Sequence, residues 1–173
     1  NHTQYSICEG ALRITDLAKY CKTNKIRAAG LCDSNNLCGA LEFSELIAKS
    51  KTQPIIGTQI NIQYKDHIGK IPLFAKDLEG YQNLIRLSSK SFLEIKDNEE
   101  PHCKIEDIET HYKGLILLTG SFDGLIGKLF FKNLTDEIFL LFKRFERTFS
   151  NNFYVEIQRH GDDGEKLFEK FLL

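Results

Sequence analysis

Six polar side chains stand where an α/β protein would place reactive groups. In chain order they are His2, Glu9, Asp33, Ser34, Gln59 and His160. Asp33 directly follows the short apolar run 27–32, and His160 comes just after the strand-like run 153–158. Reactive groups of α/β folds gather just beyond the carboxyl ends of the strands. We therefore expect these side chains to lie near one another.

Four of these residues, His2, Glu9, Asp33 and His160, carry imidazole or carboxylate groups, which bind divalent metals. A metal site is one interpretation of the pattern. The other is structural: Asp33 caps the helix after it, the two histidines make local hydrogen bonds, and Glu9 is solvated. The residues are scattered singly along the chain, so their spacing alone leaves both interpretations open.

The elements that would position these residues follow from apolar periodicity. Predicted helices cover 14–21, 37–50, 78–92, 105–110, 124–131, 135–149 and 165–173. Predicted strands cover 27–32, 54–64, 70–76, 114–120 and 153–158. Within 37–50 the inner stripe is predicted to be Leu37, Ala40, Leu41 and Ser44. This alternation predicts an α/β fold with much parallel sheet, and it does not separate an open doubly wound sheet from a barrel.

Composition sets the class of protein. The chain has 173 residues, of which 27% are charged and 42% hydrophobic, with a net charge of −1. Such a chain can bury a real core and is not disordered. No apolar run approaches the roughly 18 residues of a membrane span. The balanced charge argues against a dedicated nucleic-acid clamp.

The five cysteines predict a reducing compartment. Their number is odd and no Cys-x-x-Cys pair occurs, so neither a disulfide framework nor a zinc motif is indicated. The polar N-terminus lacks the apolar core of a signal peptide. We expect a cytoplasmic protein. Because the chain starts with Asn and stops in a predicted helix, we also expect residues 1–173 to be one domain cut from a longer protein.

Several segments, taken in order, resemble a known family. They are 2–10 (HTQYSICEG), 28–43 (AAGLCDSNNLCGALEF), 54–59 (PIIGTQ), 73–84 (LFAKDLEGYQNL), 114–120 (GLILLTG) and 154–161 (YVEIQRHG). Together they resemble the PHP (polymerase and histidinol phosphatase) domain, in the form that begins bacterial DNA polymerase III alpha subunits. The resemblance implies a distorted, TIM-like β/α barrel, of which this chain would be an incomplete part.

Active members of this family bind a metal cluster and hydrolyse phosphoesters. The resemblance matches His2, Glu9, Asp33 and His160 to ligand positions. It also shows departures. Ser34 stands in place of a histidine, Gln59 in place of a bridging glutamate, and Lys70 where a further histidine is expected.

These departures weaken metal binding, because a hydroxyl and an amide replace better donors and a lysine adds positive charge. Two-metal hydrolysis also needs anionic ligands to hold both ions. We therefore expect no cofactor, or at most one weakly bound Zn, Mn or Mg ion.

The resemblance implies a parent protein that performs DNA-templated DNA synthesis with Mg²⁺ and holds the DNA itself. The domain is then expected to be a non-catalytic scaffold that stabilises the polymerase and docks the proofreading exonuclease subunit. The docking surface would be the exposed face of helix 135–149 or the loop 93–102, although core packing already explains the spacing of the phenylalanines in that helix. The alternative is an active metal-dependent 3′–5′ exonuclease or phosphoesterase. A free-standing metabolic phosphatase fits the motifs less well.

Overall fold

A computed structural model describes all residues of the chain, 1–173. The strands are β1 (Ala28–Ser34), β2 (Gln53–Tyr64), β3 (His67–Ala75), β4 (Cys103–Lys104), β5 (Leu115–Leu118) and β6 (Phe153–Tyr154). The helices are α1 (Ile14–Thr23), α2 (Ala40–Lys49), α3 (Leu78–Leu93), α4 (Ile105–Thr110), α5 (Leu125–Phe131), α6 (Thr135–Phe149) and α7 (Glu165–Leu172), with a 3-10 turn, η1 (Ser150–Asn152), after α6.

The strands form one mixed sheet in the order β1-β2-β3-β5-β6, and β4 pairs with β2. β1 runs parallel to β2, and β5 runs parallel to β6. β3 is antiparallel to both of its neighbours. The predicted α/β class is confirmed, but the sheet is less parallel than expected. The reason is the two-residue turn between Tyr64 and His67, because so short a connection can join only antiparallel strands.

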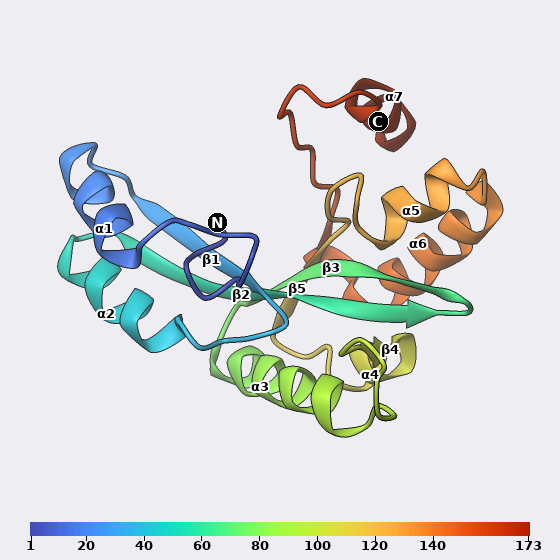
Figure 1. Ribbon diagram of the computed structural model, residues 1–173, viewed down its shortest axis with the longest axis horizontal. Helices are drawn as coiled ribbons and strands as arrows, with labels where there is room; N and C mark the ends of the chain where they lie inside the picture. Colours follow the sequence, from blue (N-terminus) through green and yellow to red (C-terminus); the bar gives the residue numbers. More distant parts are fainter.

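Helices cover the sheet from several sides (Figure 1). The long β2–β3 hairpin crosses the molecule, with α1 and α2 near one end and α5 and α6 near the other. α3 and α4 lie along one side of the hairpin, and α7 follows an extended segment. The sheet is open, since β1 and β6 stand at the two ends of the strand order.

Two apolar clusters hold these layers together. The larger contains 20 buried residues and joins β2, β3 and β5 to the helices from α3 onward. The smaller contains nine and joins β1 to α1 and α2, with Ile14, Leu31 and Phe43 fully buried. Helix α1 buries the face that the sequence predicted, which consists of Ile14, Leu17, Ala18 and Cys21. All five cysteines are free thiols.

Two predictions of local structure were wrong in detail. In α2 the buried stripe is Ala40, Phe43 and Ile47, while Leu41 is 72% exposed. Phe43 and Ile47 lie four residues apart and are both fully buried against β1 and α1, and a helix in this rotation leaves Leu41 outside. The last strand is also shorter than predicted. The Glu156 N–H donates to the Thr119 hydroxyl at 2.9 Å instead of to a β5 carbonyl, so the ladder ends at Tyr154.

Candidate functional site

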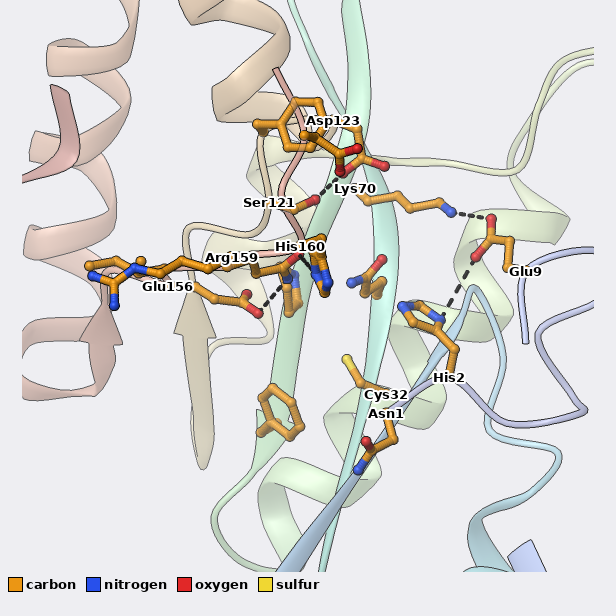
Figure 2. A pocket seen from close by; sticks show the side chains of 17 residues that line it. Asn1, His2, Glu9, Cys32, Lys70, Ser121, Asp123, Glu156, Arg159 and His160 are labelled. Atoms are coloured by element: carbon orange, nitrogen blue, oxygen red, sulfur yellow. Dashed lines mark hydrogen bonds and ion pairs between the residues drawn. The ribbon is translucent and has the colours of Figure 1, made fainter. Parts of the chain in front are cut away.

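A cavity of about 860 Å³ opens where the N-terminal loop, the sheet and the segment after β6 face one another (Figure 2). Its walls include four of the six residues that the sequence singled out: His2, Glu9, Gln59 and His160. Lys70 from β3 also lines it. Asp33 and Ser34 do not line the cavity, although both lie at the end of β1 beside the N-terminal loop.

Asp33 is completely buried, and its carboxylate is bound by the N-terminal loop. Its Oδ1 accepts from the Thr3 N–H and the Ser6 hydroxyl, both at 2.6 Å, and its Oδ2 accepts from the Thr3 hydroxyl at 2.7 Å. Asp33 therefore does not cap α2, whose N-cap residue is Gly39. Three strong donors leave this carboxylate little capacity for a metal ion.

The N-terminal loop is fixed over the end of β1 by main-chain bonds as well. The Asn1 carbonyl accepts from the Cys32 N–H at 2.9 Å, and the Asn1 side-chain amide donates to the Gly30 carbonyl at 3.0 Å. Thr3 then forms a parallel bridge with Leu12. These contacts bring His2 and Glu9 to the rim of the cavity although their own side chains take no part in them.

Glu9 lies between two donors from different strands. The Ser34 hydroxyl of β1 donates to Oε2 at 2.5 Å. The Lys70 ammonium of β3 donates to Oε1, the bond drawn between the two side chains in Figure 2. Burial alone would raise the pKa of Glu9, but the hydrogen bonds from Lys70 and Ser34 together outweigh it and hold that pKa below its ordinary value. Glu9 is therefore an ionised carboxylate whose two oxygens are both engaged, and the expectation that it is merely solvated was wrong.

His2 stands beside this pair. Its Nδ1 lies 3.2 Å from the Ser6 hydroxyl and 3.8 Å from Glu9 Oε2. Ser6 has already given its one hydroxyl proton to Asp33, so the Nδ1 must be the donor, and Nε2 keeps its lone pair. Burial of the ring is the main cause that lowers the pKa of His2 below 6.5. The imidazole is therefore neutral near pH 7 and attracts Glu9 only weakly.

His160 reaches the cavity from the opposite wall, on the segment that follows β6 (Figure 2). Its ring Nε2 lies 3.3 Å from the Gln158 side-chain oxygen. Glu165, the first residue of α7, holds this segment in place: its carboxylate accepts from the N–H groups of His160 and Gly161 at 2.8 Å. These hydrogen bonds lower the pKa of Glu165, and the bond from the His160 N–H has the largest effect.

Sequence reasoning missed several residues of this site. Thr3 and Ser6, which bind Asp33, gave no signal beyond being small hydroxyl residues in the first motif. Glu156 lines the cavity, and its Oε2 is buried without a donor while Oε1 accepts from Gln158 at 2.7 Å. Burial raises the pKa of the Cys32 thiol to about 12, so the cysteine in the wall is not a thiolate nucleophile.

The residues present do not form a set suited to a metal cluster. No group of three or more His, Cys, Asp or Glu side chains is arranged to hold a metal ion. The two carboxylates predicted as ligands are bound by protein donors, and an ammonium touches one of them. The only donors left from the predicted set are the two imidazoles, on opposite walls of the cavity.

Comparison with known families places the chain. Residues 1–160 match the family model of the PHP domain. Since this match covers more than half of the chain, the protein belongs to the PHP domain family. The resemblance drawn from the motifs is thereby confirmed. The predicted α/β fold class is confirmed as well: the chain forms an open mixed sheet covered by helices.

The curated relatives of this chain include DNA polymerase III alpha subunits. The DNA polymerase III subunit alpha of Rickettsia felis is 35% identical over 168 residues, which are 96% of this chain and 14% of the relative. The same subunit of Caulobacter vibrioides is 36% identical over 165 residues, 91% of this chain and 14% of the relative. The chain thus spans about one seventh of the length of these relatives.

Among solved structures, a protein from Bifidobacterium adolescentis assigned as a metal-dependent phosphoesterase is 17% identical, with a TM-score of 0.42 over 52% of this chain and 30% of that one.

None of the helices of this chain combines the length and the apolar character needed to cross a bilayer.

Proposed function

We propose that this PHP domain serves a replicative DNA polymerase alpha subunit as a non-catalytic scaffold. Its likeness to the N-terminal region of such subunits supports the assignment to a polymerase. In this proposal the rest of the polymerase chain holds the DNA, uses Mg²⁺ and performs DNA synthesis in the cytoplasm. The domain contributes no metal and no hydrolytic step.

One observation carries the non-catalytic part of this proposal: the carboxylates needed for a metal cluster already bind protein donors. Asp33 accepts three hydrogen bonds from Thr3 and Ser6, and Glu9 accepts from Ser34 and Lys70. Binding a metal would break these bonds and bring a divalent charge beside an ammonium. Hydrolysis by two metals requires anionic ligands that are free to bridge them.

The exonuclease subunit of the replicase is the proposed partner. Two surfaces support such docking. The helix α6 leaves Phe139 and Leu140 about half exposed, at 53% and 51%. Leu93, the last residue of α3 and the first of the segment 93–102, is 80% exposed. Adjoining exposed apolar side chains are typical of surfaces that another chain covers, whereas single ones are common on any protein surface, so α6 is the better supported of the two.

The test uses the full-length alpha subunit. We expect purified enzyme to release no nucleotide from the 3′ end of single-stranded DNA when its own polymerase carboxylates are inactivated, with or without added Mn²⁺. Chelator-sensitive release that disappears in a His160→Ala variant would overturn the scaffold role.

A second candidate function, metal-dependent hydrolysis, is favoured by one observation. The Glu156 Oε2 is buried at the cavity without a donor, and His160 lies on the same segment. If the domain were a phosphoesterase, Glu156→Gln would abolish its activity. In the scaffold role that variant leaves DNA synthesis unchanged.

A further inference from the structure

Lys70 occupies an unusual place for a lysine. Its side chain is only 28% exposed and points across the rim of the cavity toward Glu9 (Figure 2). It is therefore not a freely solvated surface cation. The other long cation of the cavity wall, Arg159, is 73% exposed and pairs with Glu169 of α7.

The strand register shows what the Lys70 contact spans. Ser34 of β1 pairs with Gln59 of β2, and Lys70 of β3 pairs with Asn61 of β2. Glu9 accepts from Ser34 with one oxygen and from Lys70 with the other. Its carboxylate therefore bridges β1 and β3 across the intervening strand and ties the N-terminal loop to both.

Glu9 and Lys70 neutralise each other without any ion. Glu9 contributes one negative charge and Lys70 one positive charge, while the buried Asp33 is stabilised by three hydrogen bonds. A divalent cation brought to Glu9 would meet the Lys70 ammonium at contact distance, and like charges this close repel strongly when they are partly shielded from water. The ammonium and a metal ion therefore compete for the same carboxylate.

We propose that Lys70 is the resident cation of this site, holding the N-terminal loop against the sheet in place of a metal ion. This inference rests on the non-catalytic role proposed above, but it concerns what keeps the loop in place and not whether the domain hydrolyses DNA. It predicts that removing the ammonium loosens the loop and opens Glu9 to a divalent ion.

The test is hydrogen exchange of the loop amides 3–10 in the full-length alpha subunit carrying Lys70→Met. The loop should exchange about threefold to fivefold faster than in the unmodified protein, the factor expected from losing one partly exposed ion pair. Millimolar Mn²⁺ should slow the exchange again in this variant and leave the unmodified protein unchanged. Lys70→Arg, which keeps the charge, should retain slow exchange without Mn²⁺.

Lys65→Met is the matched control, because Lys65 lies in the same hairpin and its ammonium binds Glu137 outside the cavity. This variant should leave the hydrogen-exchange rate of the loop amides unchanged.

Unaltered loop exchange in Lys70→Met would overturn the inference, and so would faster exchange that Mn²⁺ does not reverse. In either case the scaffold role would stand. Protection of the unmodified protein by Mn²⁺ would overturn the inference too, and the nuclease assay would then decide the scaffold role separately. Should Lys70→Met fail to fold, Glu9→Gln tests the same contact and should also loosen the loop.

Discussion

Asp33 is the residue on which the N-terminal loop is built. It is buried, it forms no salt bridge, and its charge is stabilised by hydrogen bonds from one backbone N–H and two hydroxyls. A buried carboxylate is tolerated only when its oxygens are satisfied in this way. The loop residues Thr3 and Ser6 therefore satisfy the buried carboxylate, and the carboxylate in turn holds the loop in place.

Replacing Asp33 with Asn should therefore destabilise the protein. The amide nitrogen would face donors instead of accepting from them, which costs about 2–4 kcal/mol. Urea unfolding measures this free energy. Asp16→Asn is the control, because Asp16 is exposed and pairs only with Lys19. If Asp33→Asn lowers the free energy of unfolding no more than the control does, the role given to this carboxylate is contradicted.

At this scale the sequence predicted residue types better than contacts. It identified His2, Glu9, Asp33 and His160, but it did not show that Lys70, 61 residues from Glu9, would reach that carboxylate. Nor could it show that the hydroxyls of Thr3 and Ser6 would donate hydrogen bonds to the Asp33 carboxylate. Such contacts depend on how the loop folds back over the sheet, and no local periodicity encodes that.

Among the elements, α4 and α6 are joined by a half-buried ion pair. Arg144 donates to both oxygens of Glu109, at 2.8 and 2.7 Å, and to Glu106 at 3.0 Å. The hydrogen bond from Arg144 is the main cause that lowers the pKa of Glu109 below 4.5. A carboxylate with a lowered pKa stabilises the fold only while it is ionised.

Glu109→Gln should cost about 1 kcal/mol at pH 7, the upper end for a pair of this exposure. The stabilising contribution of Glu109 is complete above its ordinary pKa of 4.5 and is lost as the pH falls through the lowered folded value. Urea unfolding from pH 7 to pH 3 should therefore show the difference between the two proteins shrinking toward zero. Glu106→Gln, at a more exposed and singly bonded position, should cost less. A difference that stays constant with pH would contradict this explanation.

The start of α3 packs directly on the turn before β5. A Cβ atom on Gly80 would lie 1.9 Å from the Gly114 carbonyl oxygen, and Gly114 itself has a φ of +68°. Main-chain atoms cannot move aside as a flexible side chain can. Both glycines are therefore required by the close approach of the two segments.

Gly80→Ala should destabilise the fold by about 2 kcal/mol in thermal or urea unfolding, because overpacking outweighs the gain of about 1 kcal/mol that Ala brings to a helix. Gly30→Ala is the control: its Cβ would lie 3.5 Å from the Phe74 ring, an ordinary contact. An equal effect of the two substitutions would show that the contact with Gly114 is not what matters.

Most elements were predictable because each has its own periodicity or cap, as with Asp77, which accepts from the Gly80 N–H at the start of α3. The errors came from longer-range effects. The spacing of Leu41 permits an inward position, yet the helix packs through Phe43 and Ile47 and leaves Leu41 exposed. The end of β6 depends on the Thr119 hydroxyl, which is far away in sequence.

At the scale of the whole molecule, the chain is a PHP domain with an open mixed sheet, and it spans about one seventh of the DNA polymerase III alpha subunits to which it is similar. The sheet ends at β1 and β6. Asn1 of the N-terminal loop is hydrogen-bonded along β1, and the cavity lies between this loop, the sheet and the segment after β6. The family could be recognised from the motifs because they occur in order along the whole chain. Ser34 and Gln59 predict weak metal binding from the sequence alone, but the bonds of Glu9 to Ser34 and Lys70 could be found only from the three-dimensional contacts.

The most direct test of this account is anomalous diffraction at the manganese edge from crystals of the full-length alpha subunit grown with Mn²⁺. We predict that Lys70 remains bonded to Glu9, that Asp33 remains bonded to Thr3 and Ser6, and that no multinuclear centre appears in the cavity. Two or more manganese ions held by Glu9, Asp33 or His160 would contradict the account.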